Sequence, residues 1–178
     1  MRIISGKYKS RRIIAPSKLP VRPTTDMAKE ALFNILNNRY YFDEVSFIDL
    51  FAGTGNISYE FASRGCEQIT AVDGNFGCVQ FINKTAAELD LSITTLKSDV
   101  FSFLEKTHLK SDIVFADPPY DIPQEDFEQI ASLIFKNELL LQDGVLIIEH
   151  AKQTDLSHLP NFSNQRKYGG SVFSFFEA

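Results

Sequence analysis

The segment Asp117-Pro118-Pro119-Tyr120 combines residue types that can position an amino group for reaction. Two consecutive prolines fix the backbone and remove two N–H donors, so the turn presents acceptors: the Asp117 carboxylate and the nearby backbone carbonyls. An exocyclic amine has two N–H donors, and acceptors on both hydrogens direct its lone pair at an electrophile. Tyr120 adds an aromatic face on which an unpaired base can stack. The segment therefore predicts a site that receives the amino group of a nucleic-acid base.

A second group of residues, Asp49-Leu50-Phe51-Ala52-Gly53-Thr54-Gly55, indicates a nucleoside cofactor. Its glycines let the backbone turn sharply and approach a ligand closely. A dinucleotide site would have a third glycine where Ser58 stands, and Asp49 is unhelpful beside a pyrophosphate. Asp49 instead suits a cationic ligand, such as the ammonium and sulfonium groups of S-adenosylmethionine. The loop residues assigned to this cofactor are Asp49, Phe51, Ala52, Gly53, Thr54 and Gly55.

Two further aspartates follow predicted strands. Asp73 lies 18 residues after Gly55, where a carboxylate can accept hydrogen bonds from both ribose hydroxyls. Sites for NAD and for S-adenosylmethionine both use this bond, so Asp73 does not choose between them. Asp99 could accept a bond from an adenine amino group or cap a helix at Val100–Glu105, and the chemistry alone favours the cap.

Short apolar runs rich in Val and Ile predict the strands that position these residues. They are Val45–Phe51, Gln68–Asp73, Leu91–Lys97, Asp112–Asp117 and Gly144–His150, and helical patterns lie at Asp26–Asn38, Asn56–Ser63, Phe76–Leu89 and Glu125–Asn137. This alternation predicts an α/β fold with a doubly wound, mostly parallel, Rossmann-like sheet. If the first and fourth strands are neighbours where the strand order reverses, the glycine loop and the Asp117–Tyr120 turn flank one crevice.

The two ends of the chain depart from this alternation. Phe162–Lys167 and Val172–Phe176, joined by Tyr168-Gly169-Gly170, predict an antiparallel hairpin at the sheet edge. Residues 1–25 carry seven basic and no acidic side chains, whereas residues 26–178 carry 11 basic and 23 acidic ones. This short basic extension favours a polyanionic partner. The alternative is that Arg2–Ile14 forms a structural ribbon with solvated charges.

Composition excludes several classes of protein. The 178 residues suit one domain, with a basic extension at 1–25 and the main domain at 26–178. There is no signal-peptide pattern and no run of about 18 apolar residues, so we expect a cytoplasmic protein that contacts no membrane. Cys66 and Cys78 do not form a metal-ligand pattern, so we expect two structural thiols and no metal. No obligate protein partner is evident.

These motifs resemble class I S-adenosylmethionine-dependent methyltransferases that modify amino groups. More specifically, the chain resembles the bacterial 16S rRNA guanine-N2 methyltransferases of the RsmD type, over nearly its whole length. Beyond the two motifs above, the resemblance rests on Arg2–Lys7, Arg22-Pro23-Thr24-Thr25-Asp26, Lys29–Asn34, Ser63-Arg64-Gly65, Glu149-His150 and Lys167-Tyr168-Gly169. The sequence departs from the family pattern at Asn56-Ile57-Ser58, Gly74 and Gly170.

The resemblance implies a seven-stranded sheet, S-adenosylmethionine as cofactor and a guanine of small-subunit rRNA as substrate. It implies that Asp117, Pro118, Pro119 and Tyr120 are catalytic, and that the cofactor residues are those named above with Asp73 and Asp99. The residues expected to bind RNA are Lys7, Lys9, Arg11, Arg12, Arg22, Thr24, Lys167 and Tyr168. Three alternatives share some of these features: an adenine-N6 nucleic-acid methyltransferase, a nicotinamide-dependent dehydrogenase, and a catalytically silent RNA-binding assembly factor.

Overall fold

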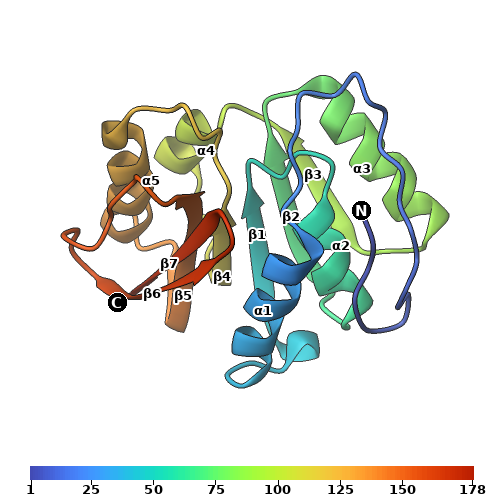
Figure 1. Cartoon of the computed structure of the whole chain (residues 1–178), viewed down its shortest axis with the longest axis horizontal. Coiled ribbons are helices and arrows are strands. Elements are labelled where there is room, and N and C mark those ends of the chain that lie inside the picture. The colour runs from blue at the N-terminus through green and yellow to red at the C-terminus, as the bar shows by residue number, and fades with distance from the viewer.

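The computed structural model describes residues 1–178 and is built on a single seven-stranded sheet of order β3-β2-β1-β4-β5-β7-β6 (Figure 1). Strands β1 to β5 are parallel, and β7 inserts antiparallel between β5 and β6. The strands are β1 (Ser46–Leu50), β2 (Gln68–Asp73), β3 (Ile93–Lys97), β4 (Ser111–Ala116), β5 (Leu140–Ala151), β6 (Phe162–Tyr168) and β7 (Ser171–Glu177). This arrangement confirms the predicted mostly parallel sheet and the antiparallel hairpin at its edge.

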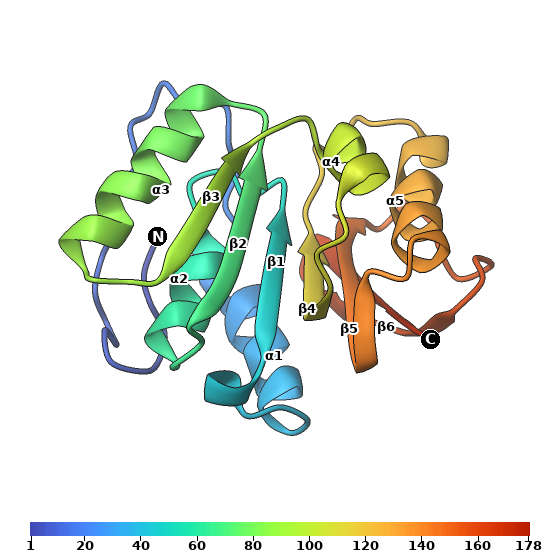
Figure 2. The same cartoon turned by 180° about the vertical axis from the view of Figure 1, so that it is seen from behind.

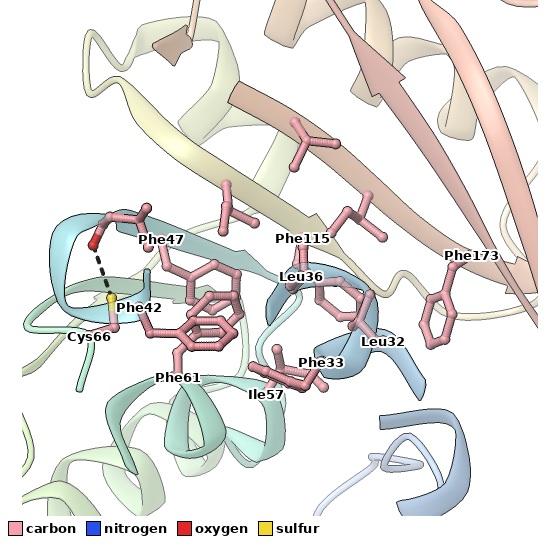
Figure 3. Close-up of a cluster of buried hydrophobic side chains, with 14 of the residues drawn as sticks. Leu32, Phe33, Leu36, Phe42, Phe47, Ile57, Phe61, Cys66, Phe115 and Phe173 are labelled. Atoms are coloured by element: carbon pink, nitrogen blue, oxygen red, sulfur yellow. Dashed lines mark hydrogen bonds between the residues drawn. The ribbon is translucent and has the colours of Figure 1, made fainter. Parts of the chain in front are cut away.

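Helices cover both faces of the sheet (Figures 1 and 2). They are α1 (Asp26–Asn37), α2 (Asn56–Ser63), α3 (Phe76–Glu88), α4 (Val100–Lys106) and α5 (Gln124–Lys136), with a 3-10 turn at Phe42–Glu44. Side chains of α1 and α2 form one core with β1, β4, β5 and β7, and side chains of α4 and α5 form a second core on the opposite face. Figure 3 shows the first core, in which Phe47 of β1 stacks on Phe61 of α2 with ring centroids 3.7 Å apart.

Strand β5 is longer than the sequence predicts, because it begins at Leu140 and not at Gly144. Leu140 pairs with Ser111, and the register then shifts before Val145 pairs with Ile113. Asp143 adopts a left-handed backbone with φ of 62° at this irregularity. The polar residues Gln142 and Asp143 hide this first part of the strand from an analysis that looks for continuous apolar runs.

The N-terminal segment runs along α2 and α3 on the outside of the sheet (Figures 1 and 2). Its only strand-like pairing is a single bridge between Arg2 and Arg12, but Ile3 and Ile13 are buried against α2 and α3. The carboxylate of Glu60 in α2 accepts hydrogen bonds from the backbone N–H groups of Ile4 and Ser5, at 2.8 and 3.0 Å. The segment is therefore anchored to the main body by its backbone and its apolar side chains.

Cys66 and Cys78 are both buried free thiols, and burial raises the pKa of each to about 11. None of the helices is long and apolar enough to cross a membrane.

Candidate functional site

A crevice of about 540 Å³ opens at the carboxyl ends of β1, β2, β4 and β5. Strand order reverses between β1 and β4, and ligands of open α/β sheets bind at such reversals. The expectation that the first and fourth strands are neighbours in the sheet is thus confirmed. The residues that line the crevice include Arg22, Thr24, Asp49, Phe51, Ala52, Gly53, Thr54, Asp73, Asp99, Asp117, Pro118, Pro119, Tyr120, Glu149 and Ser171.

Three carboxylates enter the crevice from neighbouring strands. Asp49 of β1 pairs with Phe115 of β4, which in turn pairs with Ile147 of β5. Because side chains alternate along a strand, the positions two residues later on β4 and β5 lie on the same face as Asp49. Those positions are Asp117 and Glu149. This face of the sheet therefore carries aromatic and aliphatic core residues along the strands and acidic residues at the carboxyl ends of the strands.

The glycine loop leaves β1 and leads into α2, as the sequence predicts. Gly55 caps α2 with φ of 90°, and a Cβ on it would lie 2.7 Å from the ring of Tyr59. Gly53 has φ of 57°, and a Cβ on it would lie 3.1 Å from the side chain of Val21. Both positions need glycine for their backbone and for the space around them. Gly53 lines the crevice, whereas Gly55 supports the loop from behind.

Ser58 explains the absence of the third glycine of a dinucleotide loop. Its hydroxyl donates a hydrogen bond of 2.6 Å to the Asp49 carboxylate, and both side chains are buried. Burial raises the pKa of Asp49 to about 7, although the bond from Ser58 opposes the shift. A nearby cation would stabilise the ionised form of the buried Asp49 carboxylate, and an ammonium group is a suitable cation.

Asp73 and Asp99 border the part of the crevice beside β2 and β3. The Asp73 carboxylate accepts one hydrogen bond on each oxygen, from the N–H of Gly53 and the N–H of Asn75, both at 2.8 Å. The remaining lone pairs can accept two hydroxyl groups of a ribose. Asp99 caps α4 through a bond from the N–H of Ser102 and also lines the crevice. The favoured cap is therefore confirmed, and a role of Asp99 in binding adenine stays a prediction.

Asp117 and Glu149 form an acidic pair in the other part of the crevice. The structure gives the Asp117 carboxylate no hydrogen-bond donor, and burial together with the charges of Glu149 and Asp49 raises its pKa well above the ordinary value. Burial also raises the pKa of Glu149, but there the Thr24 and Ser171 hydroxyls act in the opposite direction. Thr24 donates to Glu149 at 2.7 Å. The two carboxylates therefore differ in that Glu149 is held by a hydrogen-bond donor of the protein and Asp117 is not.

Tyr120 lies at the mouth of this acidic part and is 37% exposed. The Arg22 guanidinium lies 5.3 Å from the centre of its ring, and the Tyr120 hydroxyl lies 3.3 Å from that of Ser171. The ring is thus held between the 20–25 segment and the start of β7. Arg22 covers one face of the ring, so a base that stacks here must use the other face or displace Arg22.

Four residues at or behind the crevice have roles that the sequence did not predict: Glu149, Asn56, Lys29 and Glu60. Asn56 donates to the Thr24 carbonyl at 3.1 Å and accepts from the Lys29 ammonium at 2.9 Å. Lys29 and Glu60 are both fully buried and form an ion pair of 3.4 Å. This network ties the wall that contains Thr24 to the helix that follows the glycine loop. The sequence held three local signals: the departure at Asn56-Ile57-Ser58, and the segments Lys29–Asn34 and Glu149-His150, which share the family resemblance without an assigned role.

Several expected RNA-binding residues lie outside the crevice. Lys7, Lys9, Arg11, Arg12 and Lys167 are exposed, and none of them lines the crevice. Arg11 and Arg12 border a smaller groove of about 160 Å³ beside α3, together with Lys84. Tyr168 packs on Phe173, with ring centroids 6.0 Å apart. The structure therefore brings Arg22 and Thr24 to the crevice and leaves the other expected RNA-binding residues outside it.

Comparison with known proteins agrees with this geometry. The model of the family described as "Conserved hypothetical protein 95" matches residues 1–177. The "Putative rRNA methyltransferase YlbH" of Bacillus subtilis is 33% identical over 88% of this chain and 85% of its own length. The "Ribosomal RNA small subunit methyltransferase D" of Escherichia coli K12 is 30% identical over 97% and 86%. A structure called "Putative methyltransferase yhhF from Escherichia coli" superposes with a TM-score of 0.86 at 28% identity, over 99% of this chain and 96% of its own. The chain therefore belongs to the conserved hypothetical protein 95 family and has its S-adenosylmethionine-dependent methyltransferase fold.

Proposed function

We propose that this protein transfers a methyl group from S-adenosylmethionine to the exocyclic N2 of a guanine in 16S rRNA of the small ribosomal subunit. One observation carries the proposal: the Asp117–Tyr120 turn opens into the same crevice as the glycine loop and Asp73. A cofactor and an amino group could thus meet there. The names of the curated relatives support ribosomal RNA as the substrate class, and the motif resemblance supports guanine N2 as the target.

The residues of the crevice fit S-adenosylmethionine. Its volume of about 540 Å³ lies within the range of small-molecule sites. Asp73 has free lone pairs for the ribose, Asp49 offers a buried carboxylate for the cationic methionine end, and Asp99 can accept a bond from the adenine amine. When bound, the cofactor supplies an electrophilic methyl group attached to a positively charged sulfur. A pyrophosphate would meet the carboxylate of Asp49, which argues against NAD.

The acceptor turn performs the remaining chemistry. The Asp117 carboxylate and the Pro118 carbonyl accept hydrogen bonds from the amine and orient its lone pair toward the methyl group. Methylation makes the amine nitrogen positive, and it then loses a proton. Burial raises the pKa of Asp117, so this carboxylate is suited to take that proton late in the reaction. Tyr120 stacks on the base and keeps it at the mouth of the crevice.

The exposed basic side chains supply attraction for the RNA. Residues 26–178 carry a net charge of -12, so the main body repels phosphates, and residues 1–25 supply seven positive charges. Lys7, Lys9, Arg11 and Arg12 contact the RNA backbone away from the crevice, while Arg22 contacts it at the crevice. We retain residues 1–25 as an RNA-contacting segment for this reason, although its backbone is anchored to α2.

Two measurements test the proposed function. Calorimetry should show binding of S-adenosylmethionine and negligible binding of NAD(H). Small ribosomal subunits and naked 16S rRNA, each incubated with the protein and radiolabelled S-adenosylmethionine, should incorporate label at one site in at least one of the two forms. Tight NAD binding without S-adenosylmethionine binding would overturn the methyltransferase assignment. Cofactor binding without label in either RNA form would indicate a silent RNA-binding factor.

A further inference from the structure

The carboxylate of Glu149 has no part in the reaction described above. It is 2% exposed, it lies at the carboxyl end of β5, and it lines the crevice. Asp49, Asp73 and Asp99 suffice for the cofactor, and Asp117 suffices for the amine. Burial of a carboxylate without a salt-bridge partner is costly, so its presence in a binding crevice indicates a ligand that needs it.

Glu149 lies directly beside Asp117. Strands β4 and β5 are parallel, and Ala116 pairs with Ile148, so the next positions along the two strands are Asp117 and Glu149. Neighbouring strands are about 4.8 Å apart, and residues paired in register point to the same face. A ligand that presents its amino group to Asp117 can therefore present the adjoining atoms of its ring to Glu149.

The hydrogen-bond partners of Glu149 keep it an acceptor. The Thr24 hydroxyl donates to it, and the Ser171 hydroxyl acts in the same direction. These donors fix the carboxylate and favour its ionised form, whereas Asp117 has no such donor. The pair thus combines one carboxylate that has no hydrogen-bond donor with one that the Thr24 hydroxyl holds in place as an acceptor.

We propose that Glu149 accepts a hydrogen bond from the N1–H of the target guanine and so selects guanine over other bases that carry an amine. This inference rests on the proposed function and deepens it. In guanine, N1–H and the 2-amino group are attached to the same carbon and present two adjacent donors, which match two adjacent carboxylates. Adenine and cytosine have an unprotonated ring nitrogen beside their amine, so its lone pair would face the lone pairs of Glu149.

The test uses a base that keeps the amine but lacks the neighbouring donor. 2,6-Diaminopurine has the 2-amino group of guanine, and its N1 is an acceptor. After the labelled position has been mapped, small subunits are reconstituted with either guanine or 2,6-diaminopurine at that position. The wild-type protein should methylate guanine about 100-fold faster, which is the scale of leaving a buried carboxylate unpaired. Equilibrium binding of guanosine and of 2,6-diaminopurine riboside should show the same preference without any turnover.

Glu149→Gln is the matched variant, because its amide is of similar size and can still accept the bond from Thr24. The amide can also donate to an unprotonated N1, so the preference for guanine should fall to within about tenfold or reverse. A variant that weakens both substrates equally would show that Glu149 only supports Thr24 or tunes Asp117, and would overturn the inference. Unchanged binding of S-adenosylmethionine confirms that the variant is folded.

The wild-type protein alone provides a second test that needs no variant. Equal methylation of guanine and 2,6-diaminopurine by the wild-type protein would overturn the role of Glu149 but leave the proposed function standing. If mapping placed the label on a base other than guanine, both the role of Glu149 and the proposed function would be overturned.

Discussion

The two parts of the crevice hold their carboxylates in different ways. In the cofactor part, Asp49, Asp73 and Asp99 each accept hydrogen bonds from the protein itself. In the base part, Glu149 also accepts a hydrogen bond from the protein, through the Thr24 hydroxyl, but the neighbouring Asp117 has no donor. The cofactor part is thus preorganised before any ligand arrives, whereas the base part is electrostatically incomplete. A carboxylate without a donor is the one whose energy changes most when a ligand supplies a hydrogen-bond donor. We therefore expect methyl transfer to depend on Asp117.

The largest expected effect is the loss of the acceptor in the base part. Asp117→Ala should lower turnover by about 100-fold or more, on the scale of removing a preorganised electrostatic partner. Affinity for S-adenosylmethionine should change little, because Asp117 faces the base. Steady-state methyl transfer together with calorimetry checks both statements. Asp117→Asn is the matched control, since it keeps one acceptor oxygen and should retain more activity than alanine; near-normal turnover of the alanine variant would contradict the role of Asp117.

Loss of a carboxylate in the cofactor part should weaken cofactor binding more than it lowers turnover. Asp73→Ala leaves the N–H groups of Gly53 and Asn75 without their acceptor and removes the ribose contact, so cofactor binding should weaken by about 1–3 kcal/mol. Turnover at saturating cofactor should fall much less than in Asp117→Ala. Calorimetric Kd values and kcat measured at high cofactor concentration separate the two effects. A variant that lost kcat and kept its Kd would reverse the assignment of the two parts.

Tyr120 lies on the border between the base part and the solvent. Tyr120→Ala should cost about 1–3 kcal/mol, mostly as weaker engagement of RNA, because the stacking face is lost. Tyr120→Phe keeps the ring and loses only the contact with Ser171, so it should remain close to the wild type. Competition binding with unlabelled small subunits measures both variants. Equal losses in the two variants would assign the role to the hydroxyl and not to the ring.

The pKa of Asp49 predicts how cofactor affinity depends on pH. In the folded protein the pKa of Asp49 is about 7, above the ordinary value of 3.8. The folded state therefore holds this proton more tightly than the unfolded state does. The stability that the bound proton contributes is lost as pH rises toward 7. A bound cation favours the ionised form, so affinity for S-adenosylmethionine should rise about tenfold between about pH 6 and pH 8. Calorimetry across this range measures the slope. Asp49→Asn should bind more weakly and show a flat profile, and an unchanged slope in that variant would assign the titration elsewhere.

The smallest expected effect concerns the basic segment outside the crevice. Reversing the charges of Lys9, Arg11 and Arg12 should weaken RNA binding, and each lost phosphate contact should flatten the log–log salt dependence by about 0.7–0.9. Cofactor binding should remain intact. Charge reversal is preferable to deletion, because removal of residues 1–20 would uncover Tyr59 and Ile82, against which Ile3 and Ile13 are packed, and would leave the Glu60 carboxylate without two of its donors. An unchanged affinity and salt slope would mean that these charges are only solvated.

The sequence predicted the sheet and the crevice because the two central strands, β1 and β4, each end in a recognisable motif. Val45–Phe51 and Asp112–Asp117 are apolar runs followed by a glycine loop and a double proline, and both signals are local. Glu149 was not found because its role depends on β5 lying beside β4 and on Thr24, which is 125 positions away. Lys29 was missed for a similar reason, since a lysine in a helix is normally solvated and its partner Glu60 lies on another helix. Side chains that act across distant segments are not visible in local spacing.

The identity of the methylated nucleoside tests the central claim most directly. Small subunits or 16S rRNA labelled by the protein are digested to nucleosides, and the labelled product is compared with standards. The account predicts N2-methylguanosine as the labelled product, with the label lost when Asp117→Ala replaces the wild type. Label in N6-methyladenosine would contradict it, because the base part would then receive an amine next to an unprotonated ring nitrogen that Glu149 should exclude.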